Sequence, residues 1–174
     1  MPITVWTVGH STHSAADFRA LLAAHGIGVV ADVRRFPGSR RLPHFAAAPL
    51  AHDLATAGVH YHGIPALGGR RSPSPESTND GWRHPAFRGY ADYLATEAFA
   101  EGVMELLMLA HGAPTAVMCA ELLWWRCHRR LIADVLVSSG IRVLHIRDRE
   151  IAEPHHLAPP ARVVRGALTY AALG

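Results

Sequence analysis

Residues 117–130 concentrate more reactive side chains than any other window of the sequence. They include both cysteines of the chain, Cys119 and Cys127, together with a carboxylate, a histidine and three arginines. The pKa of a thiol falls when it lies at a helix N-terminus or beside a positive charge, and the resulting thiolate is a strong nucleophile. Cys127 directly precedes a helical pattern and is followed by His128 and Arg129. The sequence therefore predicts a reactive thiolate at this point.

The neighbouring residues allow several roles. Cys119, at the end of an apolar run, is either the partner of Cys127 or the nucleophile itself. Glu121 acts as an acid or base or anchors an arginine, and His128 could move protons. Thiols, imidazoles and carboxylates also bind metals, but no C-x2-C pair or other zinc spacing is present. We therefore predict no metal and no cofactor, and two buried thiols beside a structural Arg–Glu pair remain the alternative.

Arginine provides the second chemical signal. All 17 basic residues other than histidine are arginines, and nine of them lie within residues 34–41, 70–71 and 126–130. Guanidinium groups bind carboxylates and phosphates through two parallel hydrogen bonds. GC-rich codon usage would also produce an arginine-rich chain. The clustering favours an anion-binding site, provided that the fold brings the three groups to one face.

Apolar runs alternate with helical patterns along the chain. Such alternation, with strands apolar on both faces, indicates a parallel sheet covered on both sides. We therefore predict a single three-layer α/β domain over residues 1–174, with a mostly parallel sheet of about five strands and helices on both faces. The predicted strands cover residues 3–8, 27–33, 59–61, 115–118 and 141–146. The predicted helices cover residues 14–26, 46–57, 86–110 (with a break near 96–97 or 102) and 131–139.

Two segments do not fit this alternation. Residues 62–85 are rich in Gly, Pro, Ser and Arg, and they are predicted to form a long irregular loop. Loops of this length inside a domain are often functional, so this one could be a lid over a site. In the ambiguous tail, residues 147–174, Val163 and Val164 could form a short edge strand.

Topology gathers distant residues into one site, because ligands of an open parallel sheet bind beyond the carboxyl ends of its strands. The predicted catalytic residues at these ends are Cys119, Glu121, Cys127, His128, His10 and Asp32. The predicted substrate-binding residues are Ser11, Arg34, Ser39, Arg40, Gly68, Gly69, Arg70, Tyr90 and Arg129. Individually these assignments have alternatives: His10 could belong only to a turn, Asp32 could orient an arginine, and Tyr90 could pack in the core.

The order of the motifs resembles the DUF488 family, a bacterial and archaeal family without an assigned function. Residues 7–11 (TVGHS) are similar to the family's opening TIGHS, and residues 32–40 (DVRRFPGSR) are similar to DVRxxPxSR. Residues 67–69, 87–93, 118–121 (MCAE) and 127–129 (CHR) follow in the expected order. The resemblance implies that these positions belong to the site, and it adds no reaction.

Composition sets the remaining expectations. With two cysteines and no predicted export signal, the chain is expected to be cytoplasmic with reduced thiols. No apolar run approaches the roughly 18–20 residues that span a bilayer, so no membrane association is expected. Expected ligands are an anionic small molecule, a nucleotide or a nucleic acid, and the oligomeric state stays open.

Three functions compete. The first is a hydrolase or transferase that uses Cys127 or Cys119 as nucleophile and His10 or His128 to move protons. The second is a binding module for nucleic acid or a phosphorylated ligand, in which Trp124 and Trp125 would offer a stacking surface. The third is a thiol-redox or metal-binding role for the two cysteines.

Overall fold

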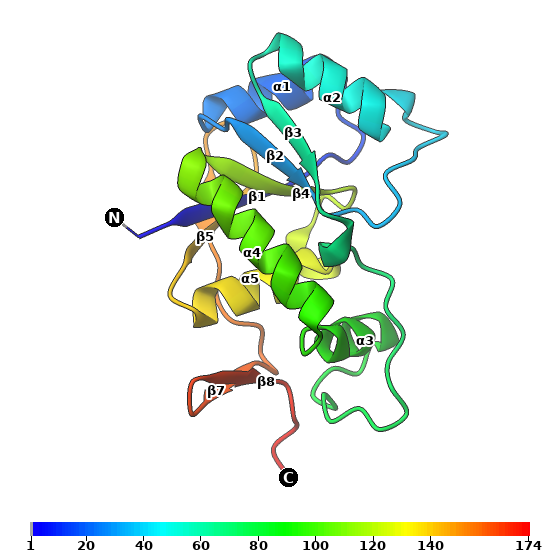
Figure 1. Cartoon of the computed structure of the whole chain (residues 1–174), viewed down its shortest axis with the longest axis vertical. Helices are drawn as coiled ribbons and strands as arrows, with labels where there is room; N and C mark the ends of the chain where they lie inside the picture. Colours follow the sequence, from blue (N-terminus) through cyan, green and yellow to red (C-terminus); the bar gives the residue numbers. More distant parts are fainter. Residues whose placement is uncertain (1) are drawn as a thin grey trace.

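The computed structural model describes residues 2–174 and contains a six-stranded sheet between two layers of helices (Figure 1). The strand order is β3-β2-β4-β1-β5-β6, and only β6 is antiparallel to its neighbour. The strands are β1 Thr4–Gly9, β2 Val29–Asp32, β3 His60–Gly63, β4 Thr115–Cys119, β5 Arg142–Ile146 and β6 Ala152–Pro154. The predicted three-layer α/β fold is confirmed. The predicted extent of one domain, 1–174, stays a prediction and includes Met1, which lies outside the described residues.

The helices divide between the two faces of the sheet. Five α-helices are present in the described chain: α1 Ala15–Ala24, α2 Ala47–Thr56, α3 Pro85–Tyr93, α4 Glu97–Gly112 and α5 Arg129–Ser138. Short 3-10 turns are η1 Pro43–Phe45, η2 Pro65–Leu67 and η3 Trp124–Arg126. The sheet has a hydrophobic core on each face, and alternate residues of β4 belong to opposite cores. This is expected because successive side chains of a strand point to opposite faces of a sheet. Val117 packs with residues of α3, α4 and α5, whereas Ala116 and Met118 pack with residues of α1 and α2.

Side-chain caps explain where the helices begin. The Ser14 hydroxyl accepts a hydrogen bond from the Asp17 N–H at 3.0 Å and starts α1. The Thr96 hydroxyl does the same for the Phe99 N–H at 3.2 Å and starts α4. Such caps satisfy N–H groups that have no partner within the helix. The predicted break near residues 96–97 is therefore confirmed, and it separates α3 from α4.

The long loop and the tail differ from the predictions. β3 continues to Gly63 because His62 and Gly63 pair with Ala31 and Asp32, so the irregular part follows η2 and covers residues 68–84. The edge strand beside β5 is β6, which the predicted sheet lacked. Val163 and Val164 do form a short strand, as predicted, but β7 Arg162–Val164 pairs with β8 Ala167–Thr169 in a separate hairpin and not with the central sheet.

No helix in the described part of the chain is long and apolar enough to cross a membrane.

Candidate active site

A cavity of about 670 Å³ lies at the carboxyl ends of β1, β2 and β4. Register explains why these ends meet: Gly9 of β1 pairs with Cys119 of β4, and Met118 pairs with Asp32 of β2. The predicted catalytic residues that line the cavity are His10, Cys119, Glu121, Cys127 and His128. The predicted substrate-binding residues that line it are Ser11, Arg34, Ser39, Gly69 and Arg70. The ends of β1, β2 and β4 therefore contribute to the cavity, together with the loop after β3.

The other predicted site residues lie behind the cavity wall or beside it. Asp32 is buried under Arg34, and Arg129 is buried behind Cys127. Tyr90 is also buried; its hydroxyl donates to the Leu67 carbonyl, and its ring packs against that of His128.

Two further predicted residues stand next to cavity residues. Arg40 is absent from the lining, whereas its neighbour Arg41 is present. A Cβ at Gly68 would lie 2.6 Å from Arg35 Cα, and one at Gly69 would lie 2.9 Å from His128 Nδ1. These glycines therefore provide room for close packing of the cavity wall.

The two cysteines form a close pair in the floor of the cavity. Their sulfur atoms lie 2.9 Å apart, and the exposed fractions are 3% for Cys119 and 8% for Cys127. Both thiols are free. η3 brings them together, because the chain turns back after Leu123 and returns Cys127 to the end of β4. One sulfur can therefore donate an S–H hydrogen bond to the other when the acceptor is a thiolate.

The surroundings favour Cys127 as the thiolate of the pair. Burial by itself would raise the pKa of Cys127, but the hydrogen bond from Cys119 and the proximity of His128 and Arg129 bring that pKa well below its ordinary value. The Arg129 backbone N–H and Nε donate to Cys127 Sγ at 3.3 and 3.4 Å. Burial raises the pKa of Cys119, and the negative charge on Cys127 raises it further. The donors around Cys127 thus favour Cys119 as the donor and Cys127 as the acceptor of the S–H hydrogen bond.

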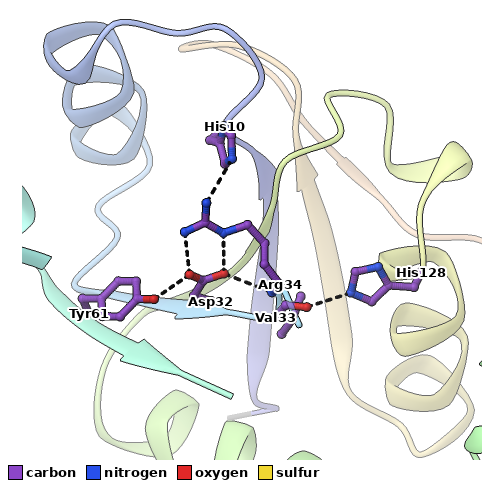
Figure 2. A network of polar contacts seen from close by, with 6 residues as sticks. All are labelled: His10, Asp32, Val33, Arg34, Tyr61 and His128. Carbon is purple, nitrogen blue, oxygen red and sulfur yellow. Dashed lines mark hydrogen bonds and ion pairs between the residues drawn. The ribbon is translucent and has the colours of Figure 1, made fainter. Parts of the chain in front are cut away.

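His128 stands between Cys127 and the backbone of β2. Its Nε2 lies 2.9 Å from the Val33 carbonyl oxygen, so Nε2 carries the proton and donates it (Figure 2). Its Nδ1 faces Cys127 Sγ at 3.8 Å. A ring held in place by a backbone carbonyl is well placed to exchange a proton with the neighbouring sulfur.

A buried ion pair forms the opposite wall. Arg34 Nε and NH2 donate to the two oxygens of Asp32 at 2.9 and 2.7 Å, and the Tyr61 hydroxyl donates to Asp32 Oδ2 at 2.6 Å (Figure 2). This bidentate pairing supports a positioning role for Asp32. It also leaves the pair without net charge, so Arg34 alone adds little to the attraction of an anion.

His10 completes this wall as a neutral ring. Its Nδ1 lies 2.9 Å from the Ser11 carbonyl oxygen, and its Nε2 lies 3.4 Å from Arg34 NH1, so Nδ1 donates and Nε2 accepts. Burial lowers the pKa of His10 to about 4, and the positive charge of Arg34 acts in the same direction. Because both ring nitrogens are occupied, the geometry supports His128 rather than His10 as the proton carrier.

Three further arginines supply positive charge to the cavity: Arg35, Arg41 and Arg70. All three are exposed, and no carboxylate forms an ion pair with any of them in residues 2–174. Only Glu121 contributes a carboxylate to the lining. The predicted convergence of arginine groups on one face therefore holds for the first two groups, whereas Arg129 of the third group lies under the floor.

Sequence reasoning missed Arg35, Arg41 and Tyr61 as members of the site. The arginine pairs at 34–35 and 40–41 were visible in the sequence, but which member of a pair faces a cavity depends on loop conformation. Tyr61 gave no signal, because its role arises only from the register that places β3 beside β2. Among residues 2–174, no three His, Cys, Asp or Glu side chains come together in a group that could hold a metal ion.

Gly9 has no side chain because the chain after β4 crosses directly over it. A Cβ at this position would lie 2.0 Å from the carbonyl oxygen of Glu121. We expect Gly9→Ala to displace the segment at Glu121 and to lower the free energy of unfolding by about 1–3 kcal/mol, as overpacking does. Urea unfolding measures this loss. The control is Gly28→Ala, whose added Cβ would meet no atom closer than 3.7 Å, and equal losses in both variants would contradict the expectation.

The fold and the cavity together define an α/β domain with two thiols and several arginines at the carboxyl ends of a parallel sheet. The chain belongs to the DUF488 family: the model described as "Domain of unknown function DUF488" matches residues 14–136. The match includes Asp32, His128 and both cysteines, and it ends within α5. Neither the curated proteins nor the solved structures contain a match to the chain.

Proposed function

We propose that the protein is a hydrolase or transferase that uses the Cys127 thiolate as nucleophile on an anionic substrate, such as a nucleotide or a nucleic-acid component. One observation carries the proposal. The sulfur of Cys127 lies in the cavity floor, accepts hydrogen bonds from Cys119 and Arg129, and faces His128. A thiolate held in this way needs no further activation before it attacks.

The proposed reaction has two steps. First, the Cys127 thiolate, whose proton has already passed to His128 Nδ1, forms a bond from its sulfur to an electrophilic carbon or phosphorus of the substrate. The bond to the leaving group breaks, and the leaving group takes the proton from His128. In the second step, water or another acceptor loses a proton to His128 and displaces the sulfur, which restores the thiolate. The same histidine thus acts as acid and then as base.

The cavity supports an anionic substrate of nucleotide size. Its volume of about 670 Å³ falls within the range typical of small-molecule sites. Arg35, Arg41 and Arg70 supply three positive charges, against one carboxylate in the lining. Arginine forks of this kind recognise phosphate or carboxylate groups.

The alternative functions receive less support from the geometry. For a nucleic-acid binding module, Trp124 and Trp125 would have to offer a free stacking surface. Trp124 is instead stacked on His145, with ring centroids 4.1 Å apart, and its Nε1 donates to Glu153 at 2.8 Å. The close sulfur pair favours thiol-redox chemistry as a second candidate, in which a peroxide or disulfide would remove two electrons and two protons to give a Cys119–Cys127 disulfide.

Two alkylating reagents that differ in charge test the proposed function. We expect anionic iodoacetate to react with Cys127 faster, relative to neutral iodoacetamide, than it does with a small free thiol. The expected increase in the rate ratio is on the order of ten-fold at low salt, because positive charges concentrate an anion in a cleft. Cleavage after Arg126 separates the two cysteines, so mass spectrometry follows Cys127 alone.

Matched variants identify the source of this selectivity. Arg41→Gln and Arg70→Gln should each lower the ratio, whereas Arg83→Gln, an exposed arginine outside the cavity, should leave it unchanged. A wild-type ratio equal to that of the small thiol would contradict the anion site. Loss of both thiols on exposure to hydrogen peroxide, with formation of an intramolecular disulfide, would favour the redox candidate instead.

A further inference from the structure

Arg129 connects the cysteine pair to the interior of the protein. Its side chain is buried, with an exposed fraction of 1% for the residue. Nε donates to Cys127 Sγ, NH2 donates to the carbonyl oxygens of Glu121 and Leu122, and NH1 donates to Thr7 Oγ1 at 3.3 Å. Arg129 thus places a positive charge behind the nucleophile, and the position of that charge depends on what holds the guanidinium group.

A chain of buried polar groups continues beyond Thr7. Thr7 Oγ1 lies 2.6 Å from His145 Nδ1, and His145 Nε2 lies 2.9 Å from His155 Nδ1. His155 Nε2 lies 2.7 Å from Asp134 Oδ1, and the Tyr170 hydroxyl donates to Asp134 Oδ2 at 2.7 Å. All five residues are buried. The chain joins β1, β5 and the tail to α5, the helix that carries Arg129 at its first residue.

The hydrogen atoms of this chain have one consistent direction. The Asp134 carboxylate only accepts, so His155 Nε2 donates to it, and His155 Nδ1 accepts from His145 Nε2. His145 Nδ1 then accepts the Thr7 proton, and Thr7 Oγ1 accepts from Arg129. Burial, which lowers the pKa of His145 to about 2, is consistent with this neutral ring. The opposite direction would leave the Thr7 proton without a partner, because Arg129 offers only N–H groups.

Packing shields this chain of polar groups, and its members come from several parts of the sequence. The Trp124 ring covers His145 in a parallel stack, with an angle of 4° between the planes. Thr7, His145, His155 and Tyr170 lie outside residues 14–136, which the family model matches. Arg129 and Asp134 lie inside that range. Segments outside residues 14–136 therefore supply side chains that hold Arg129, which lies inside that range.

We propose that Thr7 is a positioning residue, and that the chain Thr7–His145–His155–Asp134 holds the Arg129 guanidinium against Cys127 and so keeps that sulfur reactive. This inference rests on the proposed function, because it assumes that Cys127 is the nucleophile. The titratable and charged groups that face Cys127 are Cys119 from β4, Tyr90 from α3, and its neighbours His128 and Arg129. Among them, only the guanidinium of Arg129 is held by Thr7.

The test compares Thr7→Val with Thr7→Ser in the full chain. Valine has nearly the shape of threonine but neither donates nor accepts a hydrogen bond, whereas serine keeps the hydroxyl. We expect Thr7→Val to raise the pH at which Cys127 alkylation by iodoacetamide is half-maximal by at least about one unit, a ten-fold lower rate below that pH. Thr7→Ser should restore the wild-type value. Thr7→Ala serves as a second variant without the hydroxyl if Thr7→Val does not fold.

Thr115→Val is the matched control for a purely structural effect. Thr115 is also a buried threonine of the central sheet; its hydroxyl donates to the Ala113 carbonyl at the opposite end of β4. If Thr7→Val lowers the melting temperature as Thr115→Val does, and both leave the alkylation midpoint unchanged, the positioning role is overturned. If Cys127 of the wild-type protein is alkylated with the pH midpoint of an ordinary thiol, the proposed function fails as well. Failure of the positioning role and failure of the proposed function are therefore distinguishable.

Discussion

Replacement of Arg129 by methionine is expected to lower the free energy of unfolding by about 3–5 kcal/mol, the loss typical when one partner of a buried charge pair is removed. Methionine fills much of the same space but donates no hydrogen bond. The variant would leave the carbonyl oxygens of Glu121 and Leu122 and the sulfur of Cys127 without their buried donor. The buried sulfur then carries an unrecovered cost of desolvation.

Urea unfolding of Arg129→Met and of Arg126→Met measures this effect against a matched control. Arg126 lies three residues earlier in the chain and is exposed, so its replacement should cost less than about 1 kcal/mol. Comparison of the losses in unfolding free energy of the two variants distinguishes removal of a buried structural cation from a general effect of replacing an arginine. Similar losses in the two variants would show that Arg129 does not hold the segment at Glu121, and the account of the cavity floor would be wrong.

The sequence predicted the fold well where hydrophobic patterns were long. Alternating apolar strands and helices indicated the parallel sheet, and one of the two breaks predicted within residues 86–110 coincides with the start of α4. β6 was missed because it has only three residues, none of them buried, and thus no apolar pattern. Its existence depends on a turn in which the Arg147 N–H donates to the Ile151 carbonyl, a feature that periodicity does not show.

The site was predictable to the extent that it follows from topology. Ligands bind at the carboxyl ends of parallel strands, and this rule alone is sufficient to bring His10, Cys119 and Arg34 together. The 2.9 Å contact between the sulfurs was not predictable, because it depends on how η3 turns the chain back. The contact between Thr7 and His145 gave no signal either, although Thr7 begins the motif at residues 7–11. Their partnership arises from register, in which Thr7 pairs directly with His145.

The largest expected effect on reactivity follows from the proposed roles of the two cysteines, with Cys127 as the thiolate and Cys119 as its hydrogen-bond donor. Cys127 accepts hydrogen bonds from Cys119 and Arg129, and its pKa lies well below the ordinary value. A thiol with an ordinary pKa of about 8.5 is only roughly 0.3% ionised at pH 6. Alkylation of Cys127 at pH 6 should therefore exceed that of an ordinary thiol of equal access by on the order of 100-fold.

The most direct test is the rate of Cys127 alkylation by iodoacetamide from pH 5 to pH 10. Cys127→Ser, which keeps Cys119, identifies the signal that belongs to Cys127. We predict a rate that is already at or near its plateau at pH 7, with a midpoint well below that of a free thiol, and no corresponding reaction in Cys127→Ser. A rate that rises ten-fold with each pH unit up to about pH 8.5 would contradict a thiolate at Cys127 and, with it, the proposed catalytic role.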